Sequence, residues 1–257
     1  MRRLGILVIV AAGVLGVAVA ASASPGSQGR PAVPPGAVKV ADDVYYLGKR
    51  HVDGRDVEGF AFVHRAGASA GKGKPGGGGT CFAYLASGAK WKGVESWVVD
   101  DSGAPVSGMA ARLAADVATW ESAAGADVFG SGSTDTSYDA VTSSVDGRNG
   151  AEFAPIADAG VIAVTYTWGS FGGPPKSREL VEWDMIFDSD SFSWATDGSP
   201  TAMDFDDIAT HELGHAMGLG HPASTCTEET MYAYASLGET KKRDLNAGDI
   251  AGINGLY

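Results

Sequence analysis

The eleven-residue segment from His211 to His221, HELGHAMGLGH, limits what this chain can fold into more than any other feature of the sequence. Apolar residues at helical spacing predict a helix over residues 204–217, which places His211 and His215 on one face, one turn apart. Two imidazoles in that arrangement can each reach a single zinc ion at about 2.1 Å. Glu212 lies beside the pair without being needed as a ligand, where a base for a metal-bound water is expected.

The position of His221 depends on where this helix ends. On a continuous helix His221 would lie about 15 Å along the axis from His211 and about 80° around it, so the two could not share an ion. Gly218 and Gly220 offer a break, because glycine tolerates the left-handed conformation that ends helices. We expect a helix-ending turn at Gly218 to bring His221 back as the third ligand, which leaves an open fourth position typical of a catalytic site.

The alternative to a metal site is an amphipathic helix that carries incidental surface histidines. Three of the five histidines of the chain fall within this one segment, together with a glutamate and the glycines. A bare HExxH pattern arises by chance, whereas the extended pattern is far more specific. We therefore predict one catalytic zinc ion held by His211, His215 and His221.

The N-terminus has the pattern of a secretory signal peptide. Arg2 and Arg3 precede an uncharged apolar run over residues 4–20, and small residues at 21–23 follow it. This predicts cleavage after Ala23 and an extracellular protein. The alternative is a retained membrane anchor, but the run is short for a span of about 20 residues. We expect no stable membrane insertion after cleavage.

The chain has two cysteines, Cys81 and Cys226. Secretion would place them in an oxidising compartment, where one disulfide is the default expectation. Such a bond would close a long loop and contribute a few kcal/mol to stability, since it restricts the unfolded chain.

Charge is divided unevenly along the sequence. Residues 1–80 contain ten basic and five acidic residues, whereas residues 81–257 contain nine basic and 26 acidic ones. An acidic domain of this kind repels nucleic acid and anionic lipid, so neither is an expected partner.

The N-terminal part is expected to form a module of its own. A Pro/Gly/Ser-rich stretch (24–37) precedes two short strands around the turn-prone HVDGRD, and a Gly-rich linker (66–80) follows. We expect residues 24–80 to be a prosegment-like basic β-hairpin module that covers an acidic cleft until it is removed. A passive stalk or folding aid is an equally weighted alternative.

The larger domain, residues 81–257, is predicted to be mixed α/β. Strand patterns cover residues 94–100, 160–168 and 179–187, helical patterns cover 104–123, 204–217 and 246–256, and a polar loop covers 131–149. The turn-rich GSFGGPPKSR between the last two strands predicts a hairpin.

With these residues in view, the chain from about Cys81 to Tyr257 resembles the metzincin metallopeptidases, and among them the matrixin-like group of microbial secreted proteins. HELGHAMGLGH fits the extended family pattern at every defined position, and DIATHELGH and LNAGDIAGINGLY are also similar. The resemblance implies an α/β (α+β) zincin domain with a twisted mixed sheet, an active-site helix beneath the cleft and a small C-terminal subdomain. It also implies a Met-turn, with Met231 of EETMYAY as a hydrophobic floor under the imidazoles.

The implied activity is that of a secreted zinc-dependent endopeptidase with Glu212 as general base, acting as a monomer on peptide or protein substrates. The alternative is a secreted, non-catalytic zinc-binding adhesion or scaffold domain on the same fold. The intact Glu212 argues against this alternative, because a purely binding domain has no need of that base.

The sequence departs from the family in three respects. Outside the motif only His51 and His64 remain, both in the N-terminal module, so a second, structural zinc site is not expected. The cysteine-switch motif is not matched, and pairing of Cys81 with Cys226 would tie the start of the domain to the loop before Met231. Neither Tyr232 nor Tyr234 has the offset of the tyrosine that some metzincins place near zinc.

Calcium is a further candidate cofactor. Asp184, Asp188 and Asp190 offer hard carboxylate ligands of the kind that calcium prefers. A solvated acidic turn is the favoured alternative for these three residues.

Overall fold

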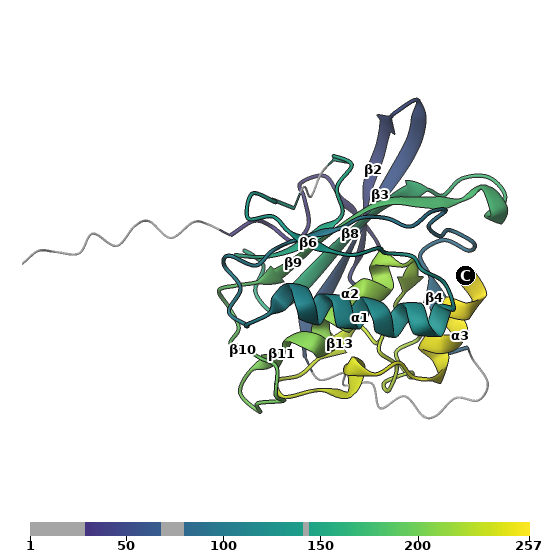
Figure 1. Cartoon of the computed structure of the whole chain (residues 1–257). Coiled ribbons are helices and arrows are strands. Elements are labelled where there is room, and N and C mark those ends of the chain that lie inside the picture. Colours follow the sequence, from purple (N-terminus) through teal and green to yellow (C-terminus); the bar gives the residue numbers. More distant parts are fainter. Residues whose placement is uncertain (1–28, 68–79, 141–143) are drawn as a thin grey trace, which may run out of the picture.

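The computed structural model describes residues 29–67, 80–140 and 144–257 (Figure 1). The predicted signal peptide, its cleavage after Ala23 and most of the predicted linker lie outside these ranges. Within the described ranges, no helix has the length and apolar character needed to cross a membrane.

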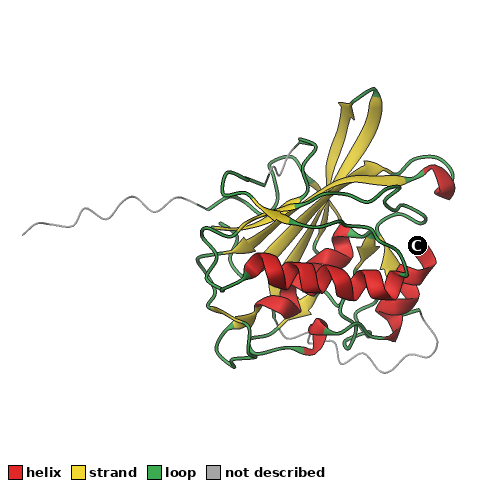
Figure 2. Ribbon diagram, viewed as in Figure 1, coloured by secondary structure: helices red, strands yellow, loops and turns green. Residues whose placement is uncertain are grey.

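A nine-stranded twisted sheet forms the frame of the molecule, and its helices lie together on one face (Figures 1 and 2). Its strands are, in spatial order, β1 (Val38–Ala41), β2 (Val44–Val52), β3 (Arg55–Ala66), β8 (Val161–Ser170), β9 (Glu179–Asp188), β7 (Gly150–Ala154), β5 (Val98–Asp100) and β6 (Ser133–Thr134), while β13 (Tyr234–Ala235) also pairs with β3. The strands from β1 to β9 run antiparallel, and those from β9 to β6 run parallel. This mixed sheet confirms the predicted fold class.

The remaining elements are the helices α1 (Met109–Ala124), α2 (Phe205–Ala216) and α3 (Ala247–Leu256), the 3-10 turns η1 (Pro175–Ser177) and η2 (Lys241–Arg243), and two small sheets that pair β10 (Trp194–Ala195) with β11 (Met203–Asp204) and β12 (Leu219–Gly220) with β4 (Ala83–Tyr84). Most of them lie below the sheet, whereas η1 lies in the connection between β8 and β9 (Figure 2).

Most predicted elements of the larger domain are present. The β8–β9 hairpin is antiparallel and almost wholly buried. The first helix begins at Met109 rather than at residue 104, because Gly108 just before it is left-handed with φ of 71°. The strand predicted over residues 94–100 is regular only in β5. The short strand β7 was not predicted; its five residues are all buried between β5 and β9.

The N-terminal hairpin lies inside the main sheet. The predicted strands are present as β2 and β3, but β3 pairs with β8 from Glu58 to Arg65. The expected hairpin module is therefore integrated in the sheet, because the edge of β8 has backbone groups that β3 satisfies. The domain division at residue 80 stays a prediction. Removal of residues 24–80 during maturation stays a prediction.

Side chains of β3 alternate between two apolar layers, as the two-residue period of a strand requires. Ala61 and Val63 pack into the layer on the outer face, with Val164 and Tyr166 of β8. Phe62 points the other way and stacks on the ring of His215 in α2. The larger core lies on this inner face, between the sheet and the three helices.

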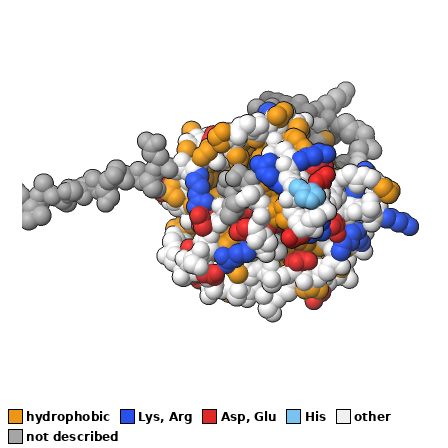
Figure 3. Space-filling model, turned by 90° about the horizontal axis from the view of Figure 1, so that it is seen from above, with side chains coloured by type: hydrophobic (Ala, Val, Ile, Leu, Met, Phe, Trp, Pro, Cys, Tyr) orange, Lys and Arg blue, Asp and Glu red, His pale blue; other side chains and the backbone are white. Residues whose placement is uncertain are grey.

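Two further expectations concern the disulfide and the charge. The predicted bond between Cys81 and Cys226 is present and joins positions 145 residues apart in sequence. Seen from above, Lys/Arg and Asp/Glu side chains are interspersed on one face (Figure 3). The charge division along the sequence is therefore not a division between surfaces on this side.

Gly214 is required by close packing beneath α2. A Cβ built there would lie 2.1 Å from Sδ of Met231 and 2.8 Å from the ring of Trp120. Overpacking of this kind costs about 1–3 kcal/mol, against the roughly 1 kcal/mol that alanine gains over glycine in a helix. We expect Gly214→Ala to lower the free energy of unfolding, measured by urea denaturation. Gly172→Ala, where nothing lies within 4 Å, is the control and should change it by less than about 0.5 kcal/mol.

Candidate metal centre

The helix α2 carries the first two histidines, and its two ends are well defined. Asp204 caps the N-terminus by accepting a hydrogen bond from the backbone N–H of Asp207. At the other end Gly218 adopts φ of 100°, which turns the chain back towards the helix. Gly220, expected to share in this break, lies instead in β12 and does not have positive φ.

This turn brings His221 to the other two rings. Nε2 of His215 lies 3.2 Å from Nε2 of His211 and 3.1 Å from Nε2 of His221. Three nitrogens about 2.1 Å from one tetrahedral ion would be about 3.4 Å apart. The donor set and its spacing therefore fit zinc.

The other ring nitrogens fix the tautomers of two of these imidazoles. Nδ1 of His211 donates to the carbonyl of Thr230 at 2.7 Å, and Nδ1 of His215 donates to the carbonyl of Leu219 at 2.9 Å. Each Nε2 is then left with its lone pair, which is the form that binds a metal. Burial lowers the pKa of both rings well below the usual value and that of His221 to about 4, so all three are neutral.

Glu212 lies beside this cluster and is fully buried. Its Oε2 accepts a hydrogen bond from Thr165 of β8 at 2.6 Å, and its Oε1 is 3.0 Å from Nδ1 of His64 in β3. Burial raises the pKa of Glu212 to about 8, although the Thr165 hydroxyl acts in the opposite direction. Sequence reasoning missed both partners, because each belongs to a distant strand.

Met231 forms a floor beneath α2, where it is 1% exposed and contacts the backbone of Gly214. The loop that carries it is held from α3. The carboxylate of Asp249 accepts hydrogen bonds from the backbone N–H groups of Thr230, at 2.7 Å, and Met231, at 3.1 Å. Since the carbonyl of Thr230 orients His211, Asp249 supports the metal centre indirectly by holding the backbone of Thr230 in place.

The role of Asp249 was not predicted. Its only sequence signal is its position three residues after Asn246 at the start of a predicted helix, which is the spacing of a capping box. That box is present, because each side chain accepts from the backbone of the other residue.

The three aspartates considered for calcium do not converge. Asp184 is buried and accepts a hydrogen bond from the hydroxyl of Tyr138, and Asp188 accepts from the backbone of Ile156 and Ser191. Among the described residues, the groups of side chains close enough to share an ion are His211–His215–His221 and His64–His211–Glu212. Tyr232 and Tyr234 pack against each other, with ring centroids 5.9 Å apart.

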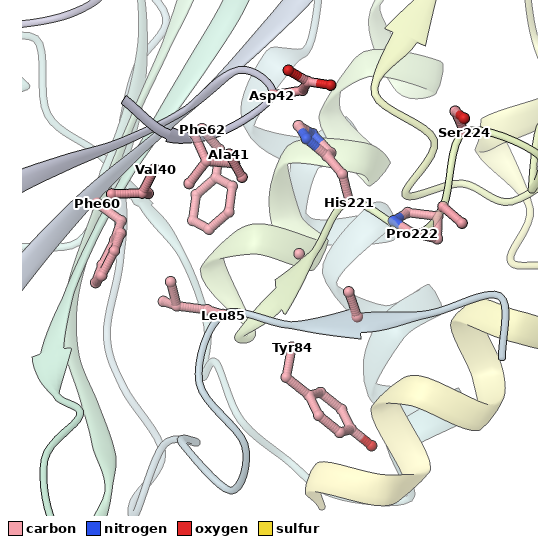
Figure 4. A pocket seen from close by; sticks show the side chains of 14 residues that line it. Val40, Ala41, Asp42, Phe60, Phe62, Tyr84, Leu85, His221, Pro222 and Ser224 are labelled. Atoms are coloured by element: carbon pink, nitrogen blue, oxygen red, sulfur yellow. The ribbon is translucent and has the colours of Figure 1, made fainter. Parts of the chain in front are cut away.

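A pocket of about 470 Å³ opens beside His221. Figure 4 shows the imidazole of His221 on one side of it and Phe60 and Phe62 of β3 on the other. The pocket thus reaches one edge of the metal centre, while β3 forms its far wall.

Two histidines one turn apart on a helix, a third returned by a glycine turn and a buried methionine beneath them form a candidate metal centre like the one that the metzincin resemblance implies. The sequence profile of the matrixin family matches residues 172–257. This part of the chain, which includes the helix, the turn and Met231, is matrixin-like.

Individual relatives are similar to this chain over segments of comparable length. Matrilysin of Rattus norvegicus is 42% identical over 74 residues, which are 29% of this chain and 26% of matrilysin. Metalloendoproteinase 1-MMP of Arabidopsis thaliana is 45% identical over 60 residues, or 23% and 15% of the two chains. The chain therefore spans about a quarter or less of the length of these relatives.

Replacing Asp249 tests how far the centre depends on α3. In Asp249→Asn an amide N–H₂ competes for the position of one carboxylate oxygen, so the Thr230 carbonyl is less well fixed. We expect zinc to bind about 10–100-fold more weakly, the usual effect of losing a group that orients a ligand, as measured by competition with a chelating dye. Asp127→Asn, an exposed aspartate, is the control. Equal zinc affinity in both variants would show that Asp249 has only a folding role.

Proposed function

We propose that this protein is a secreted zinc-dependent endopeptidase. The observation that carries the proposal is the spacing of three neutral imidazoles around one point, with the carboxylate of Glu212 beside them. Three histidine ligands leave the fourth tetrahedral position for water or substrate, which is typical of catalytic zinc. The matrixin-like character of residues 172–257 supports the same class of reaction.

The proposed reaction assigns a task to each side chain. Zinc, when bound, supplies a Lewis acid that lowers the pKa of a water molecule. In its ionised form, Glu212 would accept a proton from the attacking water and then deliver it to the departing amine. The Thr165 hydroxyl orients one carboxylate oxygen so that the other can face the water. Met231 packs under the helix and keeps the two ligands of α2 in place.

Secretion is part of this proposal. It is supported by the signal-peptide pattern before Ala23 and by the disulfide between Cys81 and Cys226. Disulfides persist in oxidising compartments outside the cytosol. The substrate class proposed is an extended peptide or an unfolded segment of a protein.

The alternative of a non-catalytic zinc-binding scaffold is not favoured. Glu212 is buried and oriented by a hydroxyl, at a cost in desolvation that metal binding alone does not require.

Glu212→Ala separates catalysis from metal binding. The variant should keep one zinc ion per chain but cleave casein about 10²–10⁴-fold more slowly, since general base catalysis supplies a factor of that size. Zinc content is measured by atomic absorption and cleavage by release of soluble peptides. Glu228→Ala, an exposed glutamate, should behave as the wild type. Cleavage by Glu212→Ala at the wild-type rate would overturn the assignment.

Removing the metal should abolish activity by a different route. A strong chelator is expected to stop cleavage, and added zinc should restore it. His211→Ala should fail to retain zinc and stay inactive after zinc is added, because a ligand is missing. Cleavage that persists in the chelator would rule out a zinc-dependent reaction.

A further inference from the structure

The strand β3 lies directly across the candidate metal centre. The ring of Phe62 stacks on His215, with centroids 4.1 Å apart, and the ring of His64 lies 3.9 Å from that of His211. With β3 in place, His211, Glu212 and His215 are 0% exposed. The pocket beside His221 has room for a few side chains, but a polypeptide cannot pass over the three rings in this arrangement.

The backbone of β3 is held on both edges. One edge pairs antiparallel with β8, and the other, at Arg65 and Ala66, pairs parallel with β13. β13 follows the loop of Met231, so β3 bridges the sheet above the metal centre and the loop below it. Extended peptides bind open strand edges in this way: main-chain hydrogen bonds give affinity, and alternate side chains fill pockets.

His64 makes the most specific contacts of the strand. Its Nδ1 lies 3.0 Å from Oε1 of Glu212, and its Nε2 lies 3.1 Å from Nζ of Lys242. Lys242 is fully buried and also donates to the carbonyl of Tyr234 in β13. A neutral His64 can accept from Lys242 and donate to Glu212 at the same time, so it occupies the carboxylate that the reaction needs.

We propose that β3 is an inhibitory strand that fills the peptide groove between β8 and β13, with His64 as its anchor. The inference rests on the proposed endopeptidase function. Phe62 covers one ligand of the metal centre and His64 engages the base. The sequence between β3 and Cys81 is Gly-rich and suited to cleavage, and a peptide substrate would take the same two edges once β3 has left.

His64→Ala in the full chain tests the anchor. Loss of a hydrogen bond to a charged group costs about 1.5–3 kcal/mol, so the fraction of molecules with an open groove should rise about 10–100-fold. The initial rate on a fluorogenic peptide should rise by the same factor. His51→Ala is the matched control, because His51 lies on the same hairpin but is exposed and its ring contacts Asp56. Thermal melting checks that both variants fold.

A second experiment places the strand in trans. A site for a specific protease is introduced between residues 68 and 79, and the folded chain is cut there. Activity of the cut chain should rise on dilution as the hairpin leaves. A labelled peptide of residues 55–66 should then bind, as measured by fluorescence polarisation, and inhibit turnover. The same peptide with His64→Ala should bind about 10–100-fold more weakly. Glu58→Gln is the control peptide, because the side chain of Glu58 contacts Tyr46 and Lys49 of β2 and lies away from the metal centre.

The two experiments separate this inference from the proposed function. Equal rates for intact and cut chain at every dilution, without binding of the peptide, would overturn the inhibitory strand and leave the endopeptidase in place. Binding that depends on His64, without turnover by any form of the protein, would keep the occupied groove and remove the proposed activity. A rise in rate for His51→Ala equal to that for His64→Ala would overturn the role of His64 as anchor.

Discussion

The tautomers of two buried imidazoles constrain everything around the metal centre. His211 and His215 present Nε2 to a shared point only while each Nδ1 donates to a backbone carbonyl, one from Thr230 and one from Leu219. Those carbonyls belong to the loop of the buried methionine and to the short strand after the glycine turn. Each must be held in place by something else, and this requirement reaches outward to α3 through Asp249 and to β4 through its pairing with β12.

What the sequence could reveal was local. The spacing of His211 and His215 predicts a shared helical face, and the conformational freedom of Gly218 predicts the return of His221; both depend on a few consecutive residues. The long apolar runs of β8 and β9 likewise predict buried strands from consecutive residues alone. The predicted start of α1 at residue 104 is too early. Apolar residues at helical spacing continue before Met109, but the left-handed backbone of Gly108 interrupts the helix there.

What the sequence could not reveal was non-local. His64 and Glu212 are 148 residues apart, and nothing in the pattern of an alternating hairpin tells which sheet edge it will join. The basic composition of the N-terminal part and the Gly-rich stretch after it indicated a separate module. The sequence did not indicate that this module pairs with the edge of β8, where a strand gains a ladder of hydrogen bonds. Asp249 was missed for the same reason, since its partners lie in another loop.

The two-sided burial of β3 has a consequence for the working form of the protein. Ala61 and Val63 lie beside Tyr166 and Val164 in the apolar layer on the outer face, while Phe62 stacks on His215 on the inner face. A molecule that sheds this strand uncovers an apolar layer as well as its reactive groups. The same strand thus stabilises the fold and covers the metal centre, so a form without β3 would have an accessible centre but a lower free energy of unfolding.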